Sequence, residues 1–91
     1  VEVAAGIHRV PVPLPFPPHE VAAWVLDGPD GHVLVDTGMD TPSARATLRD
    51  GAERLGVSPG SLAHVVVTHA HVDHFGLAGR VRAWSGATVI M

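Results

Sequence analysis

The hydrophobic and polar positions in the first part of the chain predict a β-hairpin. Residues 20–27 (EVAAWVLD) and 32–36 (HVLVD) are two short apolar runs with the β-branched and aromatic residues typical of strands. The DGPDG run at 27–31 between them is a concentration of turn-forming residues. Residues 11–18 (PVPLPFPP) contain five prolines. Because proline cannot donate to a sheet ladder, this stretch predicts an extended connector rather than a central strand.

The next pattern predicts a helix over residues 41–56. Thr41 and Pro42 form a helix start, with a hydroxyl at the N-cap and proline at the first helical position. Gly56 fits the C-terminal stop. Gly51 lies inside this helix and weakens it by about 1 kcal/mol relative to alanine. The apolar positions recur at helical spacing, at Ala44, Leu48, Ala52 and Leu55.

The rest of the chain alternates between strand and helix. Residues 64–68 (HVVVT) are a β-branched run typical of a buried strand. An apolar stripe predicts a second helix over roughly 74–84, ended by Gly86, and residues 87–91 (ATVIM) begin another strand. The order hairpin, helix, strand, helix, strand indicates an α/β fold in which helices cover a sheet.

The composition is globular but apolar for so short a chain. Hydrophobic residues make up 46% of the 91 residues, and charged residues only 16%. A small domain has much surface to cover, so we expect part of this surface to be covered by more protein. The last strand runs into Met91 without a turn or polar tail. We therefore expect residues 1–91 to be the N-terminal part of a single domain, truncated at the C-terminus.

Charge and cysteine content exclude several classes of function. The net charge is −3 and the six basic residues are scattered arginines, so nucleic acid is not an expected partner. Every apolar run is too short to span a membrane. The first residues lack the basic start of a signal peptide, and we expect a cytoplasmic protein. The chain contains no cysteine, so neither disulfides nor thiolate ligands are available.

Residues 69–74 carry the strongest chemical signal, the pattern H-x-H-x-D-H. It comprises His69, His71, Asp73 and His74, directly after the apolar strand. Imidazole and carboxylate are the ligands that Zn²⁺ takes from a chain without cysteine. If the chain stays extended, His69 and His71 project to the same side. Asp73 and His74 are adjacent and point in different directions, which favours two neighbouring metals over one.

The other histidines and one aspartate have less specific patterns. His8, His19, His32 and His64 lack partners at metal-ligand spacing, and we expect them to be ordinary surface or core residues. Asp36 ends an apolar strand in the run Val-Asp-Thr-Gly. This aspartate fits two interpretations equally well on spacing alone: a turn former, or a carboxylate that orients the imidazole ligands.

Together these motifs resemble the metallo-β-lactamase superfamily. H-x-H-x-D-H after an apolar strand is the main motif of that family, and an upstream V-D-T-G is its second common feature. The resemblance covers essentially the whole chain, but only the N-terminal portion of the family's domain. It implies that the chain is the N-terminal half of a four-layer αββα sandwich whose full domain is about twice this length or more.

The resemblance also implies roles for individual residues. His69 and His71 would ligate the first metal, Asp73 and His74 the second, and Asp36 would support the site. The implied cofactor is Zn²⁺, two ions in the complete site, with iron or manganese as alternatives. The family completes both metals with ligands from later loops, so we expect the 91-residue piece alone to be inactive.

The expected activity is metal-dependent hydrolysis of a small-molecule ester, thioester, lactone or amide. Asp73 would both bind metal and act in catalysis, by orienting the attacking water or passing a proton to the leaving group. The chain looks most like the family's general bacterial hydrolases, such as glyoxalase II-like thioesterases and lactonases. The alternatives are an iron-dependent persulfide dioxygenase-like member of the same fold, and a non-catalytic fragment that binds metal or a partner. A homo-oligomer that shares metals between copies is a further expectation.

Overall fold

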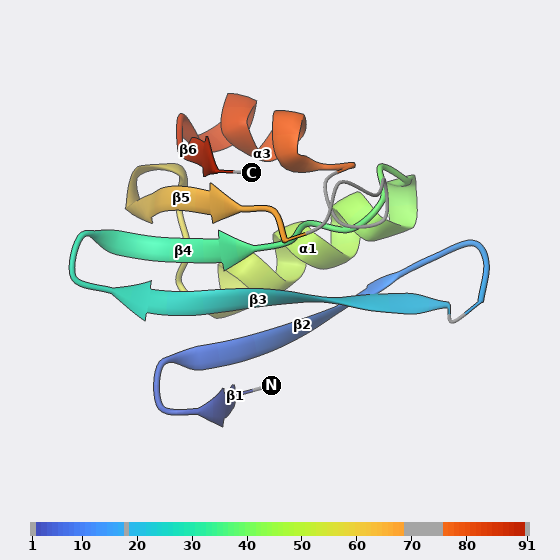
Figure 1. Ribbon diagram of the computed structural model, residues 1–91, viewed down its shortest axis with the longest axis horizontal. Coiled ribbons are helices and arrows are strands. Elements are labelled where there is room, and N and C mark those ends of the chain that lie inside the picture. Colours follow the sequence, from blue (N-terminus) through green and yellow to red (C-terminus); the bar gives the residue numbers. More distant parts are fainter. Residues whose placement is uncertain (1, 18, 69–75, 91) are drawn as a thin grey trace.

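The computed structural model describes residues 2–17, 19–68 and 76–90. Within these ranges six strands form one sheet in the order β1-β2-β3-β4-β5-β6 (Figure 1). The strands are β1 (Glu2–Ala4), β2 (Ile7–Pro13), β3 (Glu20–Gly28), β4 (Gly31–Val35), β5 (Leu62–Val66) and β6 (Thr88–Ile90). The first four pair antiparallel, whereas β4 with β5 and β5 with β6 pair parallel. The sheet is therefore mixed.

The hairpin predicted over residues 20–36 is confirmed. β3 and β4 pair antiparallel from Trp24 opposite Val35 to Gly28 opposite Gly31, so the turn is tight. The parallel strands β4 and β5 need a crossover connection, because the chain must return from the C-terminal end of β4 to the opposite end of the sheet before β5 can begin. Helix α1 (Pro42–Arg54) and the short 3₁₀ helix η1 (Pro59–Ser61) form this crossover, and α3 (Ala78–Ser85) lies between β5 and β6.

The start and the end of α1 agree with the sequence prediction. The Thr41 hydroxyl accepts a hydrogen bond from Ala44 N at 3.1 Å, and Pro42 follows at the first helical position. The helix ends at Arg54, just before Gly56. Close packing explains why the helix carries glycine at position 51. A Cβ placed there would lie 2.9 Å from Val10 Cγ1, so α1 approaches β2 too closely for a larger residue.

Helices α1 and α3 pack on the same face of the sheet. Alternate strand residues point to this face and are buried with residues of the helices in one apolar cluster. On the opposite face, Trp24, Leu26 and Val35 are only partly buried. These partly exposed side chains account for part of the high apolar content of the chain. The cluster consists of Val10, Val12, Ala23, Val25, Leu34, Ala44, Leu48, Val57, Leu62, Val65, Leu77 and Ala87.

The connector predicted at residues 11–18 is wrong in its first part. β2 continues through Pro13 and pairs with β3, with Pro11 opposite Ala22 and Pro13 opposite Glu20. β1 pairs only with Ile7 and His8, at the other end of β2. The prolines therefore occupy an edge-like stretch, where a missing N–H on the outer side breaks no ladder bond. β1 and the first half of β2 were not predicted at all.

Two other predicted boundaries are shifted. The strand predicted at 64–68 is β5, which begins and ends two residues earlier. The helix predicted at 74–84 is α3, which begins at Ala78 and ends at Ser85, with Gly86 in the left-handed conformation after it. Residues 74 and 75 of that prediction lie outside the described ranges. The described α3 therefore starts later than the apolar stripe indicated.

No helix in the described part of the chain is long and apolar enough to span a membrane.

Replacing Thr41 with alanine tests the N-cap. Thr41→Ala removes the hydroxyl that accepts from Ala44 N, and we expect the free energy of unfolding to fall by about 1 kcal/mol. Thr47→Ala is the matched control, because it lies inside the same helix and alanine is the better helix former there. Urea unfolding of both variants measures the difference, and an equal effect of the two substitutions contradicts the capping role.

Candidate metal centre

The predicted metal-binding residues follow β5 at the edge where two parallel strands end. β4 ends at Val35 and β5 at Val66, which are opposite each other in the parallel ladder. Asp36 follows the first strand and Thr68 lies just beyond the second. The motif residues, His69, His71, Asp73 and His74, lie outside the described residues. The described part comprises the end of β5 before the motif and α3 after it (Figure 1).

Asp36 ties the two strand ends together. Its carboxylate accepts from Thr68 N at 2.9 Å and from Thr68 Oγ1 at 2.7 Å, and its own N–H donates to Val66 O at 2.8 Å. Asp36 is 5% exposed and has a φ of 61°, in the left-handed region that aspartate tolerates better than most residues. The carboxylate thus holds the residue that directly precedes His69.

Asp36 also explains why β5 ends where it does. Val67 N still donates to Ile90 O of the neighbouring strand, at 2.8 Å. At Thr68, however, the backbone N–H turns to the side chain of Asp36. A side chain that comes from 32 positions earlier therefore replaces the next ladder bond. Asp36 therefore stands at a chain turn and binds Thr68, whereas its predicted role in orienting the imidazole ligands stays a prediction.

Thr37 and Gly38 hold the other end of the motif segment. Thr37 is fully buried, and its hydroxyl donates to Gly38 O at 3.2 Å and accepts from Leu77 N at 3.1 Å. Leu77 N also lies 3.2 Å from Gly38 O. The run 36–38 therefore contacts the chain immediately before the motif, at Thr68, and shortly after it, at Leu77.

Asp40 adds a third connection, between the two helices. Its carboxylate accepts from Arg80 Nε at 2.9 Å and from Arg45 Nη1 at 2.9 Å. The hydrogen bond from Arg80 and the charges of both guanidiniums lower the pKa of Asp40 from its usual value, although desolvation opposes this effect. The start of α1 and the start of α3 are therefore joined through one carboxylate.

Sequence reasoning missed Thr37, Asp40 and Arg80. The V-D-T-G run drew attention to its aspartate, but the burial of the Thr37 hydroxyl has no local signature. Thr37 and its partner Leu77 are 40 positions apart in the sequence, and so are Asp40 and Arg80. The one sequence feature that pointed to these residues was the position of the V-D-T-G run at the end of a predicted strand.

The remaining histidines lie elsewhere. His8 Nε2 is 3.9 Å and His32 Nε2 is 3.5 Å from the carboxylate of Asp27, near the hairpin turn, and His32 Nδ1 is 3.1 Å from Ser61 Oγ. Across residues 2–17, 19–68 and 76–90, no group of three histidine, aspartate or glutamate side chains is arranged to hold a metal. The prediction of a metal site therefore depends on the motif at 69–74.

Comparison with known proteins decides the family. The family model described as the metallo-beta-lactamase superfamily matches residues 16–91. The chain belongs to the metallo-β-lactamase superfamily. The resemblance stated from the two motifs is thereby confirmed. Membership implies a divalent metal, and the donor set of imidazoles and carboxylate at 69–74 fits such an ion.

Individual relatives agree with this assignment. The "Probable metallo-hydrolase YqjP" of Bacillus subtilis is 35% identical over 66 residues, which cover 72% of this chain and 20% of that protein. A metallo-β-lactamase family protein of Thermus thermophilus matches with a TM-score of 0.83 and 32% identity over 92% of this chain. A beta-lactamase domain protein of Burkholderia ambifaria matches with a TM-score of 0.81 and 32% identity over 98% of this chain. The mixed α/β fold predicted from the sequence is confirmed as a portion of the metallo-β-lactamase fold.

The chain spans only part of these superfamily members. It covers about a fifth of the curated relative, 28% of the Thermus chain and 30% of the Burkholderia chain.

Gly38 tests how tightly the run 36–38 is packed. Its φ is 87°, and a Cβ placed there would lie 2.7 Å from Val12 Cγ1. We expect Gly38→Ala to lower the free energy of unfolding by about 1–3 kcal/mol, through backbone strain and overpacking. Gly79→Ala is the control, because Gly79 lies in α3 and a Cβ at this position would meet nothing within 4 Å. Chemical denaturation of both variants provides the comparison, and equal stability of the two variants contradicts the tight packing.

Asp40 makes a prediction about pH. Because its pKa is lower in the folded protein, its stabilising effect is present above the ordinary value of 3.8 and is lost as the pH falls through the lowered value. Asp40→Asn should therefore be less stable than the parent at neutral pH, and the difference should shrink in acid. Thermal unfolding from pH 7 downward measures this, with Asp50→Asn, an exposed change on α1, as control. A difference that persists unchanged in acid argues against the ion pairs.

Proposed function

We propose that the full-length protein is a metal-dependent hydrolase of small-molecule esters, thioesters, lactones or amides. The observation that supports this most directly is the pair of hydrogen bonds from Thr68 to Asp36, because they fix the chain one residue before His69. Superfamily membership and the name of the Bacillus relative, a probable metallo-hydrolase, agree with hydrolysis. The cytoplasmic location and the small-molecule partner stay predictions.

In the proposal, the four motif residues divide between two metals. His69 and His71 hold a first metal, and Asp73 and His74 hold a second, with Zn²⁺ as the proposed ion. When bound, these ions supply Lewis-acid activation of water and of the substrate carbonyl. Asp73 orients the attacking water and can pass a proton to the leaving group. Further ligands are expected from the part of the fold that the relatives have beyond this portion.

Asp36 contributes by positioning. It does not need to touch substrate, because its two bonds hold Thr68, the residue that directly precedes His69. Carboxylates that hydrogen-bond a metal ligand directly change metal affinity when they are replaced, and Asp36 would act one residue further away, through Thr68. Thr37 does the same at the far end of the segment, through Leu77 N. Both residues lie in the run 36–38, so one short stretch supports both ends of the motif.

A zinc titration of the full-length protein tests the proposal. We expect the parent protein to bind zinc tightly and the His71→Ala, Asp73→Ala double variant to lose most of this binding. Asp36→Asn should weaken zinc affinity by up to about tenfold, the lower end of the range for residues that hydrogen-bond a metal ligand directly, because Asp36 acts through Thr68. Zinc affinity should also fall below neutral pH, because histidine must be neutral to bind metal.

The control is His19→Asn, since His19 is exposed, lies outside the motif and has a φ of 69° that asparagine tolerates. Equal zinc binding by the parent and the double variant contradicts the assigned ligands. Elemental analysis of the purified protein separates zinc from iron, and iron favours the dioxygenase-like alternative. Thioester and lactone hydrolysis by the zinc-loaded protein, lost in the double variant, completes the test.

A further inference from the structure

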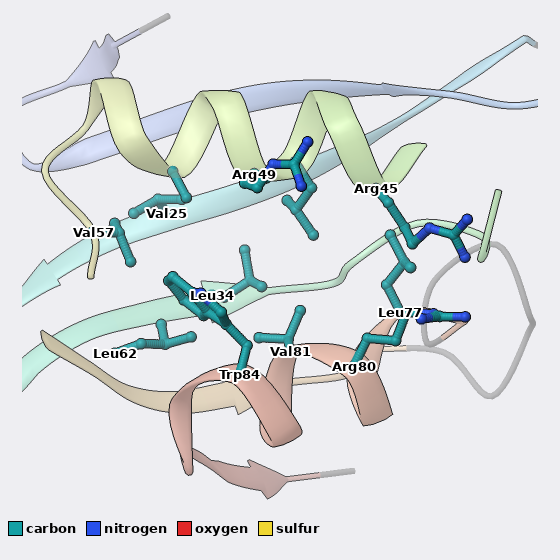
Figure 2. A pocket seen from close by; sticks show the side chains of 12 residues that line it. Val25, Leu34, Arg45, Arg49, Val57, Leu62, Leu77, Arg80, Val81 and Trp84 are labelled. Atoms are coloured by element: carbon teal, nitrogen blue, oxygen red, sulfur yellow. The ribbon is translucent and has the colours of Figure 1, made fainter. Parts of the chain in front are cut away.

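A hollow of about 340 Å³ lies between α1 and α3 on the helix-covered face of the sheet (Figure 2). Its floor is formed by the sheet, at Val25 and Leu34, and by Leu62 at the start of β5. Its walls are α1, with Leu48 and Ala52, and α3. The volume falls in the range of small-molecule sites, which are apolar clefts with a few polar groups at defined positions.

The wall on the α3 side carries an aromatic side chain that is unusually accessible. Trp84 is 44% exposed, although it lines the hollow together with Val81. In Figure 2 the Trp84 side chain reaches over the hollow toward Leu34. Burying a large aromatic surface is favourable, so a ligand with an apolar body gains contact area at Trp84 and Val81.

Cationic groups gather along the same hollow. Arg45 and Arg49 are four residues apart on α1, hence on one face of the helix, and Arg80 comes from α3. Asp40 engages Nη1 of Arg45 and Nε of Arg80, which leaves other N–H groups of both guanidiniums available. Arg49 is exposed to solvent. Three guanidinium groups therefore line the hollow, and the carboxylate of Asp40 balances only one of their positive charges.

We propose that this hollow binds a small apolar carboxylate, a short acyl chain or ring that carries one carboxyl group. The apolar part would lie on Val25, Leu34 and Leu62, against Trp84. The carboxylate would accept from Arg49 and from the remaining N–H groups of Arg45, in the forked geometry that guanidinium and carboxylate share. An excess of positive charge beside an apolar floor favours this ligand over an uncharged or cationic one. The proposal uses none of the motif residues and does not depend on the proposed hydrolysis.

The test is calorimetric titration of the full-length protein with octanoate, and with octanamide as the uncharged analogue. The protein is first stripped of metal with a chelator, because a carboxylate could otherwise bind at the metal centre. We expect saturable binding of one equivalent of octanoate and much weaker binding of octanamide. Arg49→Gln should weaken octanoate binding roughly tenfold, the effect of losing one hydrogen bond to a charged group.

Two further variants make the result specific. Arg54→Gln removes the same charge from the same helix at a position that does not line the hollow, and it should leave affinity unchanged. Ala52→Glu places a carboxylate at the wall of the hollow and should compete with the ligand. Absence of octanoate binding overturns the proposal, as does an equal loss in the Arg49 and Arg54 variants. The first outcome indicates that the rest of the protein covers the hollow. The second indicates that octanoate is attracted only by the overall positive charge of α1.

Discussion

The two hydrogen bonds between Asp36 and Thr68 are the interaction on which the described framework beside the motif depends. It joins the ends of β4 and β5, the first parallel pair of the sheet, at the edge where the motif begins. The left-handed backbone of Asp36 costs of order 1–3 kcal/mol. Each hydrogen bond to a charged group contributes about 1.5–3 kcal/mol. Two such bonds to Thr68 are therefore enough to offset the strain and to hold Thr68 in place.

The sequence predicted those parts of the fold that have local causes. The hairpin follows from DGPDG, and α1 from Thr41 and Pro42 followed by apolar residues at helical spacing. The end of β5 differs from the prediction because Thr68 N–H donates to Asp36, which is distant in sequence, instead of continuing the ladder. β2 was missed because its prolines imitate a connector. Whether proline is tolerated depends on which side of the strand is paired, and that is a property of the assembled sheet.

The candidate site divides in the same way. Residue types and spacing predicted His69, His71, Asp73 and His74 as metal ligands, and the family resemblance added Asp36 as a supporting residue; these roles stay predictions. Thr37 and the pair of Asp40 and Arg80 could not be predicted, because threonine and aspartate occur in any turn. Their partners lie 40 positions away and are brought near only when α1 crosses from β4 to β5. A candidate metal-binding motif can therefore be predicted from residue types and spacing, whereas the contacts that frame it are visible only in the folded chain.

The three contacts of the run 36–40 also bear on how metal binding and folding are coupled. Thr68, Leu77 and Arg80 lie on both sides of the motif, and all three are bonded to this one stretch. Thr68 and Leu77 are thus ordered by the fold itself, so an ion need not supply the ordering of these two flanking residues. Conversely, an ion that binds only the folded chain stabilises that stretch by mass action. Metal affinity and the stability of the sheet edge at Asp36 should therefore change together, even though Asp36 need not be a ligand.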